Sequence, residues 1–349
     1  MRRPRVVVAS VQSPFLSGGA ERHVDRLTEE LQARGVEAEK VTIPFFESTH
    51  FEVVQSALAW KFGDFERLGG EKVDAVIATR FPSYLARHRR KVVWLIHQYR
   101  VVYDQYGTAY SDFTGSEEDR RIREMVRHMD TRSLSEARRV FANSRNVAER
   151  LRKYNGVASE ALYHPPPLAG RYRQGEAGES ALWVGRLERW KRPGLAIGAL
   201  VHAPAARLKI VGDGPERAAL ESFARSAGVE SRCEFLGRVT DEELLGLFAN
   251  ARLVLATAAD EDYGYVPLEA FLSGKAVVTV TDAGGPLEFV QNDSTGYVAA
   301  PTPEALGAMI DRVWDRTSER LQLAERGRAA VERISWDHVI DTLLGAAGL

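Results

Sequence analysis

Short apolar runs alternate with amphipathic segments along the chain. In the first half these runs are rich in β-branched residues, and they begin at Val6, Ala75, Val92 and Val140. Such runs predict buried strands, and their alternation with helical segments predicts a parallel sheet covered by helices. The helix after the first strand has the clearest period, since its apolar residues share one face: Ala20, Val24, Leu27 and Leu31. Gly35 supplies its end.

The same alternation begins again at Leu182, with strand candidates in the runs LWVGRL, LKIVGDG, CEFLGRV, LVLATA and AVVTVTDAGG. Between the two patterns, residues 163–180 combine consecutive prolines with a mixture of Gly, Glu and Ser, which predicts neither helix nor strand. We therefore expect two α/β domains, at residues 1–166 and 167–334. A short amphipathic helix at residues 335–349 is expected to pack against one of them, for instance back on the N-terminal domain.

Composition limits the kinds of partner that the protein is expected to bind and the compartment in which it is expected to work. The length of 349 residues suits two hydrophobic cores, and the formal net charge of -1 argues against nucleic-acid binding. The single cysteine, Cys233, excludes an internal disulfide, and no Cys and His residues have zinc-ligand spacing. The first apolar run is too short for a signal sequence, and no later run is long enough to cross a bilayer. These features predict a cytoplasmic protein, with peripheral contact at the inner face of the membrane left open.

The segment at residues 256–278 carries the most chemical information. Its pattern predicts a buried strand that ends near Ala258, an acidic loop, and a helix that starts close to Tyr265 and stops at Gly274. Ligands of doubly wound sheets bind outside the carboxyl ends of the strands. Glu261 is therefore expected to stand at the mouth of a binding cleft.

The start of the same predicted helix is suited to a diphosphate. The backbone N–H groups of Gly264, Tyr265 and Val266 are expected to point toward the cleft at the positive end of the helix. Glu269 lies about one further turn inward and can reach a ribose hydroxyl. Because ionised glutamates only accept hydrogen bonds, Glu261 and Glu269 suit a ligand rich in hydroxyl groups.

Positive charge for a phosphate is available in the run WVGRLERWKRP. Arg186 follows a predicted strand and Gly185, and Lys191 comes a few residues later. A guanidinium and an ammonium directed at one diphosphate would stabilise the charge that grows on a leaving phosphate, without a metal or another cofactor. Taken alone, the two cations could equally be ordinary surface charges before a helix that starts at Pro193. Their combination with the acidic loop favours the phosphate site.

With these motifs in place, the chain resembles the retaining glycosyltransferases of family 4 over nearly its whole length. In the N-terminal half GGAERHVDRL resembles the glycine loop and first helix of the family. In the C-terminal half the matching motifs come in the family's order: GRLERWK, VGDGPER, FLGRVTDEEL, EDYGYVPLEAF and GGPLEFVQNDSTGYV. The resemblance implies the GT-B architecture, in which two Rossmann-like parallel-sheet domains of α/β class face each other across a cleft.

The resemblance also implies roles for single residues. Glu261 matches the family's residue for the donor sugar, and Glu269 matches its residue for the ribose. Arg186 and Lys191 match its phosphate-binding pair. In the N-terminal half, the backbone at Gly18 and Gly19 is expected to approach the donor phosphates.

His97 ends a predicted strand and is also expected near the cleft. The resemblance implies that it contacts the transferred sugar and helps to orient the acceptor. A structural histidine at the strand end is the alternative interpretation.

Four further features need separate interpretation. Asp262 stands where many family members have glycine, so the acidic loop carries extra negative charge. The glycine turn at residues 283–285 resembles the family's loop near the donor sugar. Gly212 to Pro215 form a second glycine turn, which we interpret as structural, with Asp213 capping a helix and Pro215 in its first turn. The acidic triplet at residues 260–262 is not expected to bind a metal.

Three other segments allow more than one interpretation. Residues 50–65 are rich in Phe, Trp, Ala and Val but have no clean period, so they form either a helix under the core or a lid on the acceptor side. Residues 87–91 and the Arg-rich helical pattern at residues 116–139 are interpreted as solvated charged faces. Contact of these basic segments with an anionic lipid or a phosphate is the alternative.

The sequence therefore predicts a retaining, metal-independent glycosyltransferase. It would move a sugar from a nucleoside diphosphate sugar to the hydroxyl of a sugar or lipid-linked sugar acceptor, in the biosynthesis of a glycan, a lipopolysaccharide or another glycoconjugate. The alternatives are a nucleotide-sugar epimerase or hydrolase on the same fold, and an inactive scaffold that binds a nucleotide sugar. A dehydrogenase is disfavoured, because no strand is followed by G-x-G-x-x-G spacing.

Overall fold

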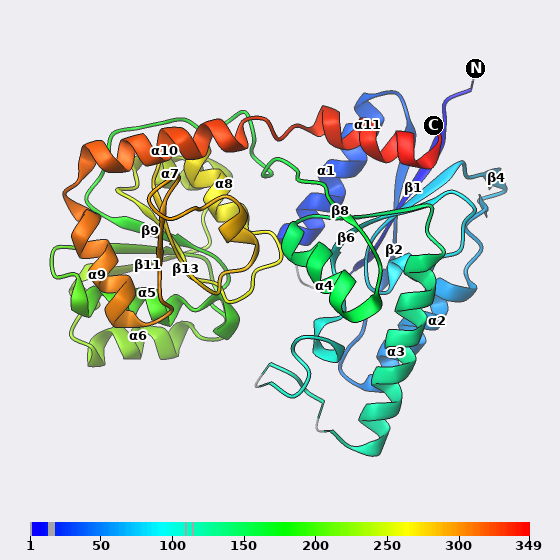
Figure 1. Ribbon diagram of the computed structural model, residues 1–349, viewed down its shortest axis with the longest axis horizontal. Helices are drawn as coiled ribbons and strands as arrows, with labels where there is room; N and C mark the ends of the chain where they lie inside the picture. The colour runs from blue at the N-terminus through cyan, green and yellow to red at the C-terminus, as the bar shows by residue number, and fades with distance from the viewer. Residues whose placement is uncertain (1, 13–17, 109, 114) are drawn as a thin grey trace. The chain divides into compact units, whose positions relative to one another are not determined.

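The computed structural model describes residues 2–12, 18–108, 110–113 and 115–349. The chain forms two compact units, of which unit 1 comprises Met1–Pro167 and Ser335–Leu349, and unit 2 comprises Leu168–Ile334. Each unit contains a six-stranded sheet in which every pairing is parallel (Figure 1). In the described parts of the chain, no helix combines the length and the apolar character that crossing a bilayer requires.

The sheet of unit 1 has the order β2-β1-β5-β6-β7-β8. Its strands are β1 (Arg5–Gln12), β2 (Glu37–Pro44), β5 (Ala75–Arg80), β6 (Lys91–His97), β7 (Arg139–Ala142) and β8 (Glu160–Ala161). A separate antiparallel hairpin pairs β3 (Arg67–Leu68) with β4 (Glu71–Lys72). The four predicted strands of this half are confirmed, whereas β2, β8 and the hairpin of β3 and β4 were not predicted.

Helices cover both faces of the unit 1 sheet. They are α1 (Gly19–Ala33), α2 (His50–Phe62), α3 (Glu117–Ser135), α4 (Arg145–Asn155) and α11 (Trp336–Ala347). Alternate residues of β1 enter different cores: Val7 and Val11 pack with α2, α3 and α4, whereas Val6 and Val8 pack with α1 and α11. This alternation is what a strand buried on both faces requires.

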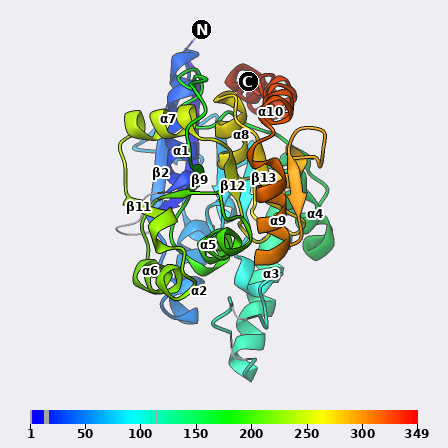
Figure 2. The same ribbon diagram turned by 90° about the vertical axis from the view of Figure 1, so that its left-hand side faces the viewer.

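Unit 2 repeats the arrangement with the strand order β11-β10-β9-β12-β13-β14. Its strands are β9 (Ala181–Val184), β10 (Leu208–Val211), β11 (Cys233–Gly237), β12 (Val254–Ala256), β13 (Val277–Val280) and β14 (Tyr297–Ala299). Its helices are α5 (Pro193–Ala199), α6 (Arg217–Ser226), α7 (Asp241–Asn250), α8 (Tyr265–Leu272), α9 (Pro303–Trp314) and α10 (Thr317–Val331). Figure 2 shows α5, α6 and α9 on one side of this sheet and α7, α8 and α10 on the other.

The predictions for the less regular segments have mixed outcomes. The first helix is confirmed, with Val24, Leu27 and Leu31 buried and Gly35 at a φ of 80°. Residues 163–180 form neither helix nor strand, as predicted. Residues 50–65 contain the regular helix α2, whose period the sequence hides because the helix is apolar on its exposed face as well.

Candidate functional site

Three loops of unit 2 meet at one edge of its sheet. The strands β9 and β13 both pair with β12, and all three are parallel. Their carboxyl ends therefore lie at the same edge, where doubly wound sheets bind ligands. The loop after β9 carries Arg186 and Lys191, the loop after β12 carries Glu261, and the loop after β13 begins at residue 281. The fold thus gathers the predicted charged residues of this half at one edge.

Lys191 and Glu261 form an ion pair between Nζ and Oε2. Both side chains are largely buried, at 22% and 16% exposure. The Lys191 Nζ also lies 4.1 Å from the centroid of the Trp190 ring, within the range of a cation–π contact. A cation and a carboxylate predicted to bind neighbouring groups of one donor therefore stand side by side.

Arg186 is the more exposed of the two predicted phosphate ligands, with a side chain that is 49% exposed. Its Nη2 lies 2.5 Å from Oε1 of Glu188, so the structure joins it to a different carboxylate from the one at Lys191. Glu188 also accepts a hydrogen bond of 2.9 Å from the Trp190 indole. Neither Glu188 nor Trp190 was predicted as a site residue, although both lie within the motif GRLERWK.

The helix α8 begins directly after the acidic loop. Its N-cap, Gly264, has a φ of 82°, and a Cβ there would lie 2.8 Å from Pro286 Cγ, so only glycine fits. Tyr265 and Val266 form the first turn, whose N–H groups have no acceptor within the helix. The helix start therefore has the chemistry of an anion site, next to the ion pair of Lys191 and Glu261.

Glu269 lies in α8 and is 7% exposed. Its Oε1 accepts a hydrogen bond of 2.9 Å from the hydroxyl of Tyr172, which belongs to the segment between β8 and β9. The Tyr172 ring packs edge-on against Phe248 of α7, with 6.2 Å between ring centroids. Tyr172 thus holds the carboxylate predicted to bind a ribose, and nothing in its local sequence indicated this contact.

The loop after β13 supports the acidic loop through its backbone. The N–H of Glu261 donates to Ala283 O at 2.8 Å, and the N–H of Gly285 donates back to Glu261 O at 2.8 Å. A Cβ on Gly285 would lie 2.7 Å from Asp262 O. The glycine turn that resembles the family's sugar loop therefore packs directly against Glu261.

The expectation that the acidic triplet at residues 260–262 binds no metal stays a prediction. Asp260 has a φ of 41°, and its N–H donates to Asp282 O at 2.8 Å. Among the described residues, no group of three or more His, Cys, Asp or Glu side chains is arranged to hold a metal ion. The backbone of the triplet is fixed by the loop after β13.

The second glycine turn of unit 2 has a packing explanation that differs from the predicted one. A Cβ on Gly212 would lie 1.8 Å from Gly185 O, and one on Gly214 would lie 2.5 Å from Leu187 O. These glycines therefore let two loops approach closely. The predicted helix cap is wrong, because α6 begins at Arg217, with Glu216 as its N-cap, beyond both Asp213 and Pro215.

The remaining predicted site residues belong to unit 1. Gly18 is the N-cap of α1, its N–H donates to Glu21 Oε2 at 2.9 Å, and Gly19 is the first helical residue. The rest of the predicted glycine loop, residues 13–17, lies outside the described residues. His97 is the last residue of β6 and is half-buried, and its Nδ1 lies 2.9 Å from Gln98 O. Because a carbonyl only accepts, Nδ1 carries a proton.

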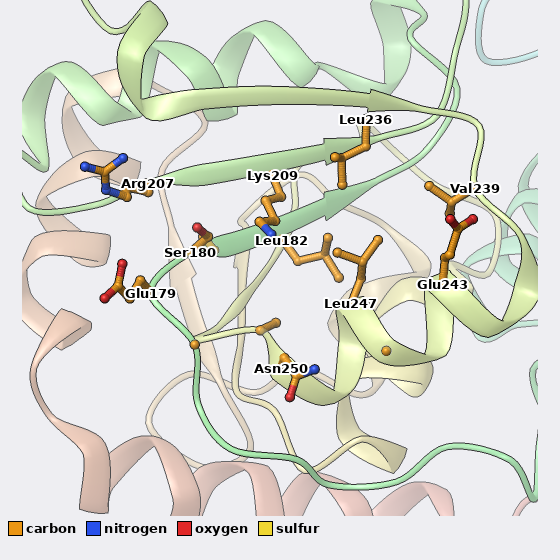
Figure 3. Close-up of a pocket in the computed structure, with 14 residues that line it drawn as sticks. Glu179, Ser180, Leu182, Arg207, Lys209, Leu236, Val239, Glu243, Leu247 and Asn250 are labelled. Carbon is orange, nitrogen blue, oxygen red and sulfur yellow. The ribbon is translucent and has the colours of Figure 1, made fainter.

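A hollow of about 680 Å³ in unit 2 lies away from this edge. Figure 3 shows its walls, with Leu182 and Lys209 on the strands and Glu243 and Leu247 on the helix that closes it. The lining comes from the segment that enters β9, from the strands β10 and β11, and from α7. None of the predicted donor-binding residues lines it, so the hollow is not part of the candidate site.

Two family models match the chain. Residues 172–330 match the model described as glycosyl transferases group 1, and residues 17–165 match the model described as glycosyltransferase family 4. A D-inositol 3-phosphate glycosyltransferase of Nocardia farcinica is 29% identical over 242 residues, which are 60% of this chain and 52% of that protein. A glycogen synthase of Mycobacterium tuberculosis is 35% identical over 177 residues, 49% of this chain and 41% of that protein. The chain spans about half the length of the curated relatives it matches.

Solved structures share the fold at lower identity. The structure of Anabaena Alr3699/HepE in complex with UDP and glucose has a TM-score of 0.72 at 20% identity, and the match covers 98% of this chain and 100% of that one. Sucrose-phosphate synthase from Thermosynechococcus elongatus has a TM-score of 0.79 at 18% identity, with coverage of 99% and 100%. Both likenesses concern the fold alone.

Proposed function

The chain belongs to the group 1 glycosyltransferases of GT-B fold, and we propose that it moves a sugar from a nucleoside diphosphate sugar to an acceptor hydroxyl. The transfer would retain the configuration of the sugar and need no metal ion. The acceptor would be a sugar or a lipid-linked sugar, as in the biosynthesis of a glycan, a lipopolysaccharide or another glycoconjugate. The retaining course follows the family 4 resemblance of the motifs.

The ion pair of Lys191 and Glu261 beside the start of α8 carries this proposal. A nucleoside diphosphate sugar presents a diphosphate next to a ring of hydroxyl groups. Lys191 and the first-turn N–H groups suit the diphosphate, and Glu261 suits the hydroxyls. The complexes of Alr3699/HepE with UDP and with UDP-glucose support a donor of this class.

The proposed reaction balances without an enzyme nucleophile. The acceptor oxygen bonds to the anomeric carbon on the face from which the diphosphate departs, and the bond from that carbon to the phosphate oxygen breaks. The acceptor proton passes to the departing oxygen. Lys191 and Arg186 would neutralise the charge that grows on the diphosphate, Glu261 would orient the sugar, and His97 would guide the acceptor.

The first experiment is a thermal-shift panel with UDP-, GDP-, ADP- and dTDP-sugars, followed by turnover with the donor that stabilises the protein. We expect one class of donor to raise the melting temperature, and we expect sugar transfer that depends on an acceptor and persists in the presence of a chelator. Turnover of the donor without any acceptor would favour the epimerase or hydrolase. Binding without turnover for any acceptor would favour the scaffold.

We also propose that α2 lies against an anionic membrane surface. The helix exposes three large apolar side chains, Phe51, Leu58 and Phe62, which are 67%, 37% and 74% exposed. They recur on one face, because seven and eleven residues are both close to whole turns of a helix. Gln55 and Ala59 complete that face, which therefore carries no charge.

Cations flank the C-terminal end of this apolar face. A hollow of about 650 Å³ there is lined by Phe62 together with Lys61, Arg87 and other basic side chains, alongside three carboxylates. In the described part of the chain, Lys61 and Arg87 form no ion pair with a carboxylate. An apolar helix face beside uncompensated cations matches the interface of an anionic bilayer.

Co-sedimentation with phosphatidylglycerol vesicles tests this contact. We expect binding that falls at least fivefold in Phe62→Ser and at high salt, and weak binding to phosphatidylcholine vesicles. Phe223→Ser is the matched control, since Phe223 is 41% exposed on α6 of unit 2. Equal binding of Phe62→Ser and wild type would refute the proposal, as would an apolar face that is instead covered by self-association in solution.

A further inference from the structure

Arg192 has a backbone conformation that favours glycine. It follows Lys191 directly and has φ 52° and ψ 48°, in the left-handed region. A Cβ in this region crowds the backbone, so the left-handed conformation favours glycine. A residue that keeps a strained conformation is held by surrounding contacts, and such residues cluster at functional sites.

The guanidinium of Arg192 supplies those contacts. Its Nη1 and Nη2 donate to the two carboxylate oxygens of Asp282 at 2.9 and 2.7 Å, a bidentate pair. Its Nε donates to Thr257 O at 2.8 Å, and Nη2 donates to Ala258 O at 3.1 Å. The side chain is 19% exposed. One arginine therefore binds both the loop after β12 and the loop after β13.

Further hydrogen bonds run from the loop after β12 to the backbone of the loop after β9. The Thr257 hydroxyl lies 3.1 Å from Lys191 O and 3.0 Å from Arg192 O, and it accepts a hydrogen bond of 2.9 Å from the Trp183 indole. The N–H of Ala259 donates to Trp190 O at 2.9 Å. The loop after β9 is thus fastened to the loop after β12 on both sides of Lys191.

We propose that Arg192 is a positioning residue that holds Lys191 and Glu261 in the positions at which they bind the donor. Lys191 is its neighbour in the chain, and Glu261 lies in the loop that the guanidinium holds at Thr257. Asp282 precedes Ala283, whose carbonyl accepts from the Glu261 N–H. The inference rests on the proposed function, since it assigns Arg192 a role in the same donor site.

The expected effect on catalysis is large compared with the effect on folding. Small displacements of positioning groups can lower a rate about 100-fold. Replacement of Arg192 by glycine removes the guanidinium but relieves the left-handed backbone. If Arg192 mattered only through its backbone conformation, Arg192→Gly would be at least as active and as stable as the wild type.

The test compares Arg192→Gly and Arg192→Lys with Asp293→Gly. Asp293 is an exposed residue of unit 2 that also has a positive φ, of 58°, and it lies in a turn before β14. We expect Arg192→Gly to lower kcat/KM for the donor 10- to 100-fold, mainly through kcat, while the melting temperature stays near that of the wild type. Arg192→Lys, which cannot form the bidentate pair, should be intermediate. Asp293→Gly should leave transfer unchanged.

Chemical rescue and hydrogen exchange separate this inference from the proposed function. Millimolar guanidinium or methylguanidinium should restore part of the activity of Arg192→Gly and none of that of Lys191→Ala. In the unliganded protein, amides of residues 257–261 and 282–285 should exchange faster in Arg192→Gly. Unchanged exchange, or wild-type transfer by Arg192→Gly, would overturn the positioning role. A wild type that transfers no sugar would instead overturn the proposed function, and the exchange result would still decide the role of Arg192.

Discussion

Charged side chains at the carboxyl edge of unit 2 occur in pairs. Arg186 contacts Glu188, and Lys191 contacts Glu261. An exposed pair such as that of Arg186 contributes about 0 to 1 kcal/mol to stability, and in the more buried pair of Lys191 the cost of desolvation offsets much of the attraction, so neither pair is a main source of stability. The two pairs matter for ligand binding, because a bound diphosphate and its sugar would meet fixed charges of opposite sign.

Removal of either partner of the central pair is therefore expected to affect transfer far more than stability. Lys191→Ala and Glu261→Ala should each lower kcat/KM by about 100-fold or more, as the loss of an electrostatic contact to a leaving group does. Steady-state kinetics with the identified donor, together with melting temperatures, measure this. Lys209→Ala is the matched control, since Lys209 also faces a glutamate, Glu234, at 3.6 Å in unit 2. Near-normal rates in both site variants at saturating donor would count against the site.

Asp130 is a carboxyl group of unit 1 whose ionisation is strongly affected by burial. Its side chain is fully buried on α3, and its Oδ2 accepts a hydrogen bond of 2.7 Å from the Tyr103 hydroxyl. Burial raises the pKa of Asp130 from 3.8 to about 7. Between about pH 4 and pH 7, Asp130 therefore keeps its proton in the folded chain and releases it in the unfolded chain.

This difference predicts how stability depends on pH. The contribution of Asp130 to the free energy of unfolding is fully retained below about pH 4, is lost as the pH rises to about 7, and is level above that. Asp130→Asn removes the titration and keeps an acceptor for Tyr103. We expect it to flatten the profile, by up to about 4 kcal/mol at pH 8 relative to pH 4. Urea unfolding between pH 4 and 8.5 measures this, with the exposed Asp311→Asn as control. Parallel profiles for Asp130→Asn and wild type would contradict it.

At the scale of elements, apolar periodicity identified the buried strands and missed short or edge strands, of which β2 and β14 are two examples. β2 is an edge strand with the sequence EAEKVTIP, and most of its residues are at least partly exposed. An edge strand has one neighbour and contacts solvent, so charged residues are compatible with it and no apolar run forms. β14 has only three residues and is also at an edge. Both misses reflect position in the sheet rather than propensity.

Two helical glycines provide a matched test of packing. A Cβ on Gly246 of α7 would meet nothing within 4 Å, whereas one on Gly307 of α9 would lie 2.4 Å from Ala199 O. Gly246→Ala should stabilise unit 2 by about 0.5 to 1 kcal/mol, because alanine restricts the unfolded chain and favours helix. Gly307→Ala should destabilise it by about 1 to 3 kcal/mol, because α5 and α9 must separate. Urea unfolding of both variants measures the two signs, and equal shifts would contradict this account.

At the scale of the whole molecule, the last helix of the chain belongs to the first unit. Ser335 caps α11, and Trp336 packs against rings of unit 1, with centroid distances of 6.1 Å to Trp94, 5.9 Å to His164 and 6.3 Å to His23. His23 and His164 are buried, and burial lowers the pKa of both. The apolar face of α11 thus completes a core formed by residues more than 150 positions away.

Trp336→Ala should therefore weaken unit 1 and leave unit 2 intact. A buried tryptophan truncated to alanine typically costs about 3 to 5 kcal/mol. We expect hydrogen exchange to lose protection in β1 and β6 but not in β9 or β12. Trp314→Ala, in α9 of unit 2, should show the reverse pattern, since Trp314 is buried in the core of that unit. Loss of protection across both sheets in either variant would show that the units do not unfold separately.

The sequence by itself determined the order of buried strands and helices, and with it the edge at which the loops carrying Arg186, Lys191 and Glu261 come together. Apolar periodicity is local, and the carboxyl ends of parallel strands share an edge whatever the loops contain. Only the tertiary structure decided which side chains touch across those loops. Such contacts join residues 70 to 97 positions apart: Lys191 with Glu261, Arg192 with Asp282, and Tyr172 with Glu269. They depend on strand order and loop packing, which no local pattern of hydrophobic and polar residues encodes.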